Sequence, residues 1–338
     1  MELYGGIDLH SNNHMITILD EADRRIFERR LPNDLQLTRR TLEPYREHLV
    51  GVAVESTFNW YWLVDGLMDS GYPLHLVNTA AVQKYSGLKH CDDRHDARWL
   101  AHLLRLGILP TGYIYPKEER AVRELARQRG RLVQLRSSQL TALQTQIWRV
   151  TGQKLSARIL KGDADEGWPA LPYEEQRFAV ASVRRVIGTL TEEIESLEQR
   201  ILQRVKLAKP FQVLRTVNGI GEILALTIML EVGDIRRFAS VGQFASYCRC
   251  VESIHSSNGK RKGEGNRKNG NPHLAWAFHE AAHFAIRYLP AAQRFYQRKA
   301  RERNAIVAMK ALAHKLARAC YYVLRDEVEF EPARLFSN

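Results

Sequence analysis

The chain has 338 residues, of which 45% are hydrophobic, and this is enough for two or three domains with buried cores. Its formal net charge of +12 predicts a polyanionic partner, nucleic acid before an acidic membrane surface. We expect no signal peptide, no membrane span and no zinc site, because the start is not cationic, the apolar runs are short, and the four cysteines form no C-x-x-C pair.

The first part of the chain alternates short apolar runs with helical patterns. The predicted strands are Leu3–Leu9, His14–Leu19, Arg25–Leu31, Val50–Val54 and Pro73–Val77, and the predicted helices are Leu37–His48, Trp60–Met68 and Ala97–Leu106. Three consecutive strands followed by alternating helices and strands are typical of a ribonuclease-H-like fold. We therefore predict an α/β domain with a mixed sheet over residues 1–115.

Residues 116–209 have the periodicity of long helices. Apolar residues recur at helical spacing first at Leu140, Leu143, Ile147 and Val150, and then in a heptad pattern at Val183, Ile187, Leu190, Ile194, Leu197 and Ile201. Glycines and prolines between residues 161 and 172 separate the two patterns. We predict an antiparallel helical hairpin or a coiled-coil oligomerisation arm.

The first of these long helices is rich in arginine. It carries eight basic residues against three glutamates, and Arg127 and Arg131 lie near its middle. A solvated helix face is the alternative, but the arginine excess favours contact with RNA or DNA. Pro210 then opens a third region, residues 210–338, which we predict to be mainly α-helical. Its segment from Arg294 to Arg318 is again basic and is expected to bind nucleic acid.

Four acidic residues occupy informative positions. Asp8 lies inside an apolar strand and Glu55 ends another, while Asp93 and Asp96 open an amphipathic helix. Buried carboxylates are costly unless a cation compensates them. Mg²⁺ prefers such oxygen ligands, and two ions about 4 Å apart can act on a phosphodiester. Each acid alone could be a surface residue or a helix cap, and the spacing also allows Asp92 in place of Asp93.

Two further segments suggest contact with phosphates. Gly219 and Gly221 form a tight turn before an apolar helix, whose first N–H groups could hold a phosphate; a plain glycine cap is the alternative. The polar segment 253–272 supplies the basic residues Lys260, Arg261, Lys262, Arg267 and Lys268. Ser256 or Ser257 in this segment could attack a phosphodiester, although a flexible polar loop is the simpler reading. We interpret four histidines near the acids as satisfied surface residues rather than proton shuttles, namely His10, His14, His90 and His95.

Two blocks of motifs closely resemble the DEDD transposases of bacterial insertion sequences, the IS one-ten family, which is related to Piv-type invertases. The first block reads Gly6-Ile-Asp8-Leu-His, Ala53-Val-Glu55-Ser-Thr57 and Asp93-Arg-His-Asp96-Ala-Arg98. The second reads Leu214-Arg-Thr-Val-Asn-Gly219-Ile-Gly221, Glu231-Val-Gly-Asp234 and Gly265-Asn-Arg-Lys-Asn-Gly-Asn-Pro-His-Leu274. Tyr247-Cys-Arg-Cys-Val-Glu252 and Ser256-Ser-Asn-Gly259 depart from the commoner pattern and look like the eleven-eleven subgroup.

This resemblance implies a RuvC-like domain that binds Mg²⁺ through Asp8, Glu55, Asp93 and Asp96. It also implies a C-terminal transposase domain whose serine, matched to Ser257 with Ser256 adjacent, forms a phosphoserine link to DNA. Family members act on donor and target double-stranded DNA, are guided by a structured non-coding RNA, and work as dimers that pair into tetramers. We therefore expect an RNA-guided recombinase that is cytoplasmic and nucleoid-associated. The alternatives are a junction-resolving nuclease that uses metal-activated water and a non-catalytic nucleic-acid-binding protein.

Overall fold

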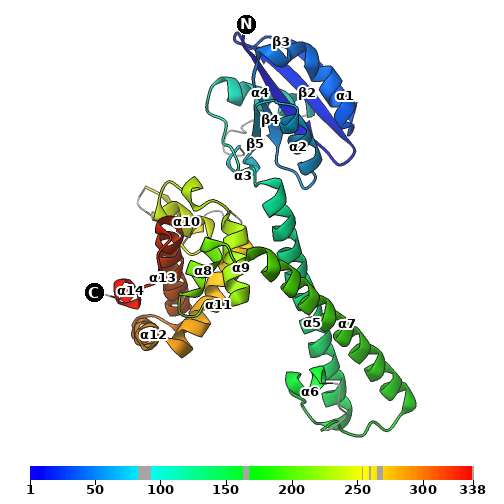
Figure 1. Cartoon of the computed structure of the whole chain (residues 1–338), viewed down its shortest axis with the longest axis vertical. Coiled ribbons are helices and arrows are strands. Elements are labelled where there is room, and N and C mark those ends of the chain that lie inside the picture. Colours follow the sequence, from blue (N-terminus) through cyan, green and yellow to red (C-terminus); the bar gives the residue numbers. More distant parts are fainter. Residues whose placement is uncertain (83–92, 163–166, 253, 259, 265–268, 337–338) are drawn as a thin grey trace. The chain divides into compact units, whose positions relative to one another are not determined.

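The structure is a computed structural model that describes residues 1–82, 93–162, 167–252, 254–258, 260–264 and 269–336 (Figure 1). The chain divides into two compact units, Met1–Lys117 and Glu118–Asn338. Among the helices in the described ranges, none combines the length and the apolar character that crossing a membrane requires. The three predicted regions 1–115, 116–209 and 210–338 stay a prediction, since the helical hairpin and the C-terminal helices fall in one unit.

The first unit is built on a five-stranded mixed sheet, as the sequence predicts. Its strands are β1 (Leu3–Leu9), β2 (Asn13–Asp20), β3 (Arg25–Pro32), β4 (Leu49–Glu55) and β5 (Leu74–Val77). They lie in the order β3-β2-β1-β4-β5 (Figure 1). The first three strands are antiparallel, and β4 and β5 run parallel to β1. This order is compatible with a RuvC-like domain and places β1 at the centre of the sheet.

The two faces of β1 have different neighbours because side chains alternate along a strand. Leu3, Ile7 and Leu9 share a core with helices on one face. The helices of the unit are α1 (Leu35–Leu42), the 3₁₀ helix η1 (Glu43–His48), α2 (Tyr61–Asp69), α3 (Thr79–Val82) and α4 (Asp93–Arg105). The predicted helix Leu37–His48 is thus split at Glu43, because Pro44 has no N–H to continue the α-helical ladder.

Helix α4 packs against the opposite face of β1 at Gly6. A Cβ atom on Gly6 would lie 2.0 Å from the carbonyl oxygen of Ala97 and 2.7 Å from the backbone nitrogen of Ala101. Only a hydrogen fits at this point, so the helix lies directly on the strand. The close packing brings the first turn of α4, which carries Asp93 and Asp96, to the face of β1 that carries Asp8.

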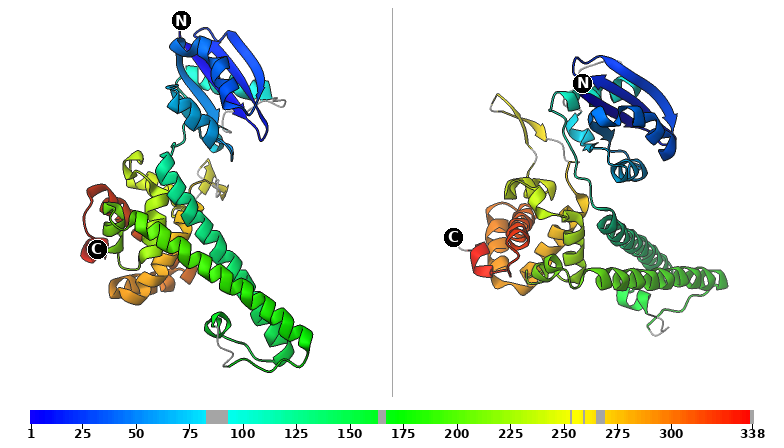
Figure 2. Two further views of the ribbon diagram at one scale, coloured as in Figure 1. Left: turned by 45° about the vertical axis from the view of Figure 1, so that its right-hand side comes forward. Right: turned by 45° about the horizontal axis from the view of Figure 1, so that its top comes forward.

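The second unit contains the predicted antiparallel hairpin. Its helices are α5 (Lys117–Thr151), α6 (Ala157–Lys161) and α7 (Glu174–Val205). Val180 and Ile187 of α7 share a buried core with Leu143 and Ile147 of α5. Polar contacts between the two long helices, such as Arg129–Glu198 and Arg136–Thr191, have the register of antiparallel neighbours. Both views in Figure 2 show α5 and α7, in green tones, side by side.

The rest of the second unit is mainly α-helical, as predicted. Its elements are α8 (Lys209–Arg215), α9 (Glu222–Val232), η3 (Ile235–Arg237), α10 (Val241–Tyr247), β6 (Ile254–Ser257), β7 (Lys260–Glu264), α11 (Pro272–Tyr288), α12 (Pro290–Glu302), α13 (Ala305–Asp326) and α14 (Pro332–Phe336). The sequence predicts only a polar loop between α10 and α11, whereas the structure forms the hairpin β6–β7 there (Figure 2). The short polar strands lack the apolar alternation that identifies a strand in a sequence.

Candidate functional site: an acidic cluster and a serine hairpin

Asp8 is a buried carboxylate at the centre of the sheet. It lies near the end of β1, is 2% exposed, and is a neighbour of Glu55 at the end of the parallel strand β4. Burial raises the pKa of Asp8 to about 8, and the hydrogen bond with Glu55 and the negative charge of that residue act in the same direction. Such a pKa shows that the surroundings of Asp8 oppose its negative charge unless a cation is supplied.

The other two acids of the motif come from the first turn of α4. Asp93 accepts a hydrogen bond from Arg30 on β3, and this contact lowers the pKa of Asp93 below its usual value. Asp96 is exposed, and its charge adds to the rise in the pKa of Asp8. Asp8 thus has Glu55 as a hydrogen-bond partner, Asp93 within 4.8 Å and Asp96 close enough to act through its charge. Asp92, which the spacing allows in place of Asp93, lies outside the described residues.

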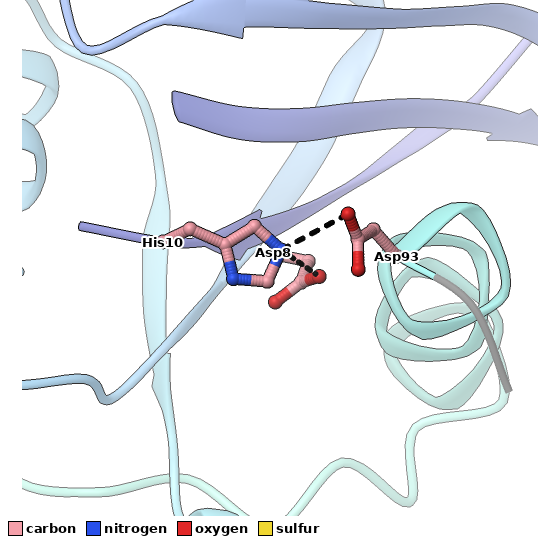
Figure 3. Close-up of side chains that lie close together, drawn as sticks. All are labelled: Asp8, His10 and Asp93. Carbon is pink, nitrogen blue, oxygen red and sulfur yellow. Dashed lines mark ion pairs between the residues drawn. The ribbon is translucent and has the colours of Figure 1, made fainter. Parts of the chain in front are cut away.

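His10 belongs to this cluster, because its ring contacts two of the acids although its side chain is 38% exposed. Its Nε2 atom lies 3.1 Å from Asp8 Oδ2 and 3.3 Å from Asp93 Oδ2 (Figure 3). The spacing Asp8-x-His10 is a signal for this contact, because residues i and i+2 point to the same side of an extended chain. His14 is fully buried and contacts Asn33, so its interpretation as a surface residue is wrong, while His90 lies outside the described residues.

The cluster fits a divalent metal ion. Asp8 Oδ2 and His10 Nε2 are buried and, among the described residues, have no hydrogen-bond partner. One ligand atom each from Asp8, His10 and Asp93 lies within 4.8 Å of the others. Buried polar atoms without partners are uncommon and call for an explanation such as a bound ion. A divalent cation would compensate the converging carboxylates and polarise a phosphate oxygen.

The predicted nucleophile lies in the hairpin β6–β7 of the second unit. Ser257 is the last residue of β6, and its backbone pairs with that of Lys260. Lys260 and Lys262 are exposed. The side chains of Ser256, Ser257 and Arg261 lie outside the described part of the structure, as do all atoms of Arg267 and Lys268. The preference for Ser257 over Ser256 therefore stays a prediction.

Arg249 holds the chain that closes this segment. It adopts a positive φ of 55° and donates hydrogen bonds of 3.1 Å to the carbonyl oxygens of Asn269 and Gly270. Asn271 then donates its backbone N–H to the carbonyl oxygen of Tyr247, and its side chain caps the first turn of α11. The two ends of the serine segment are thereby fixed to each other at the start of α11.

The predicted nucleic-acid contacts on α5 and at the glycine turn have different surroundings. Arg127 donates hydrogen bonds to the buried carboxylate of Glu231, whereas Arg131 is exposed. Gly219 has a φ of 97°, and a Cβ there would lie 2.5 Å from the carbonyl oxygen of Ala281 in α11, so packing alone requires glycine. Gly221 is the N-cap of α9 and supplies no side-chain cap. Phosphate binding at this turn stays a prediction.

Comparisons with known proteins match the chain in both of its compact units. Residues 5–150 match the family model of IS110-type DEDD transposases, described as "Transposase", and residues 211–297 match the "Transposase IS116/IS110/IS902 family". The "Transposase for insertion sequence element IS1111A" of Coxiella burnetii is 23% identical over 294 residues, 84% of this chain and 78% of that protein.

Two further relatives are similar over shorter stretches. The "Putative transposase y4qE" of Sinorhizobium fredii is 26% identical over 231 residues, 68% of this chain and 57% of that protein. The "Insertion element IS110 uncharacterized 43.6 kDa protein" of Streptomyces coelicolor is 26% identical over 155 residues, 46% of this chain. The matched stretch spans 38% of that last relative's length. With a DEDD match at its acidic cluster and a transposase match over its serine hairpin, the chain belongs to the IS110 (one-ten) family of DEDD transposases.

Proposed function

We propose that the protein is a recombinase that cuts and rejoins DNA to excise and insert a mobile element. The observation that carries this proposal is the convergence of four acids at Asp8, whose buried carboxylate has a pKa raised to about 8. A cation bound there would stabilise the charge of a phosphodiester under attack. Asp8, Glu55, Asp93 and Asp96 would hold a divalent metal, Mg²⁺ by the family resemblance.

The serine of the hairpin β6–β7 is the proposed nucleophile. Attack by the Ser257 hydroxyl on a phosphodiester would join its oxygen to phosphorus and release a 3′ or 5′ hydroxyl of the DNA, with the serine proton passing to a base. The exposed Lys260 and Lys262 lie on the same hairpin and would stabilise the phosphate charge. Rejoining then reverses the step with a new DNA hydroxyl.

Base recognition is proposed to come from RNA. The protein carries a net charge of +12, and Arg294, Arg298 and Lys310 are exposed on α12 and α13. Such groups bind phosphates without reading sequence. A structured non-coding RNA that pairs with donor and target DNA would supply the specificity. We further propose that dimers pair into tetramers through the helical hairpin.

The decisive experiment is covalent trapping. Protein, element-end DNA and the flanking RNA are incubated with Mg²⁺, denatured, and resolved on a gel. We expect a DNA adduct that is absent in Ser257→Ala and present in Ser256→Ala. Cleavage by Ser257→Ala without any adduct would instead favour a junction-resolving nuclease that uses water. Absence of metal-dependent cleavage in the unmodified protein, with binding intact, would favour a non-catalytic nucleic-acid-binding protein.

A further inference from the structure

His10 lies at the acidic cluster although it is not part of the four-acid motif. It follows β1 directly, and its ring faces the same side of the chain as Asp8 (Figure 3). The Nε2 atom is 3.1 Å from an oxygen of Asp8 and 3.3 Å from an oxygen of Asp93. Two carboxylates from separate elements thus converge on one imidazole nitrogen.

Neither of these short contacts has the geometry of a strong hydrogen bond, although His10 also helps to lower the pKa of Asp93. Within the described residues, the Nε2 atom of His10 and the Oδ2 atom of Asp8 are buried without a hydrogen-bond partner, despite their separation of 3.1 Å. The ring nitrogen therefore does not point directly at either oxygen.

This arrangement matches neighbouring ligands of one metal ion. In an octahedral site with bonds of about 2.1 Å, adjacent ligand atoms lie about 3.0 Å apart, and each points about 45° away from its neighbour. The two measured separations, 3.1 and 3.3 Å, are close to this spacing. A hydrogen bond would instead need the N–H to point nearly straight at the oxygen.

We propose that His10 is a ligand of the metal ion at the acidic cluster, and that the site therefore prefers Mn²⁺ or a later transition ion to Mg²⁺. The inference rests on the proposed function, because it concerns the same metal. Imidazole nitrogen is a good ligand for transition ions, whereas Mg²⁺ selects hard oxygen. Replacing one oxygen or water by His10 Nε2 thus changes which cation binds best.

The competing role for His10 is that of a protonated counter-ion between two carboxylates. The two roles predict opposite effects of removing the ring. A ligand that is removed weakens the binding of a transition ion, and the loss of groups that only orient ligands already costs about 10–100-fold. A positive counter-ion that is removed strengthens the binding of every cation, because it no longer competes for the carboxylates.

The experiment measures metal binding to the full chain without DNA. Mn²⁺ and Mg²⁺ affinities are determined by titration calorimetry for the wild type, His10→Ala, His10→Asp and Asp8→Asn. Electron spin echo spectroscopy of bound Mn²⁺ reports directly whether a ¹⁴N atom is coordinated. The matched control is His48→Ala, which removes an exposed imidazole just before β4, at the opposite end of β1 from Asp8.

We expect His10→Ala to weaken Mn²⁺ binding roughly tenfold or more and Mg²⁺ binding less, and to abolish the nitrogen signal. His10→Asp should lose the nitrogen signal but retain Mg²⁺ binding, since it supplies a hard oxygen. His48→Ala should resemble the wild type. Stronger binding in His10→Ala, or a nitrogen signal that persists in it, overturns the proposal. Unchanged binding in Asp8→Asn would instead show that the acidic cluster is not the metal site, which contradicts the proposed function itself.

Discussion

Arg127 and Glu231 form a two-point ion pair that joins the long helix α5 to helix α9. The Nε and Nη2 atoms of Arg127 lie 2.7 and 2.9 Å from the two carboxylate oxygens of Glu231. Asn271 donates a further hydrogen bond of 2.7 Å to the same carboxylate, which is 3% exposed. Since Asn271 also caps α11 directly after the serine segment, the pair connects the base of the helical hairpin to the chain that carries Ser257.

Arg127→Ala should destabilise the second unit by about 3–5 kcal/mol, because it removes the cation that pairs with the buried Glu231 carboxylate. Urea unfolding of the full chain, followed by circular dichroism, measures the change. Arg131→Ala is the matched control on the same helix. It removes an exposed arginine and should change the free energy of unfolding by no more than about 0.5 kcal/mol. Equal effects of the two variants would contradict a structural role for the ion pair.

Stability should depend on pH through Glu231. Burial by itself would raise the pKa of this carboxyl, but the hydrogen bonds and charge of Arg127 outweigh burial and lower the pKa from 4.5. A carboxyl whose pKa is lowered by folding stabilises the folded state at pH values above its pKa in the unfolded chain. This contribution is lost as the pH falls through its pKa in the folded protein. The unfolding free energy of the wild type minus that of Glu231→Gln should therefore decline below about pH 4.5. A difference that stays constant or grows on acidification would be inconsistent with this linkage.

Gly6→Ala should displace α4 from β1. The new Cβ would meet the backbone of Ala97 at 2.0 Å, and a helix backbone cannot move aside as a side chain can. We expect a loss of at least about 2 kcal/mol in the unfolding free energy, within the range of overpacking, and weaker metal binding because Asp93 and Asp96 move with the helix. Gly112→Ala, where the nearest atom lies at 3.5 Å, is the control and should retain both properties.

The two glycines of the α8–α9 turn should respond differently to alanine. Gly219→Ala requires a left-handed backbone, which costs about 1–2 kcal/mol, and also clashes with the backbone of α11. Gly221 has a negative φ of −82° and nothing near its Cβ position, so Gly221→Ala should change stability by less than about 1 kcal/mol. Thermal unfolding measures the stability change in each variant. If Gly221→Ala weakens DNA binding without loss of stability, the turn contacts phosphate.

Asp8→Asn should stabilise the metal-free protein while it abolishes cleavage. The pKa of Asp8 is raised to about 8 by burial and by Glu55, so an uncharged amide suits this position better than a carboxylate when no cation is bound. The metal-free melting temperature should rise, and the further rise on adding a divalent metal, seen in the wild type, should disappear. An unchanged response to metal in the variant would place the ion elsewhere.

The sequence by itself determined much of this protein. Strand and helix periods located the five strands and the long helices, because alternation and heptad spacing are local properties of the chain. The acids of the cluster were identifiable because Asp8 and Glu55 lie in apolar strands and Asp93 and Asp96 open a helix. The family followed from motifs in order along the chain.

Only the tertiary structure decided which groups meet. Asp8 and Asp93 are 85 residues apart, and their approach depends on the close packing of α4 at Gly6. That packing also brings Asp93 to His10, whose contact with Asp8 follows from their spacing along the chain. In the same way, the arginine-rich pattern of α5 could not show that Arg127 pairs with Glu231, because desolvation and ion pairing depend on neighbours that are distant in sequence.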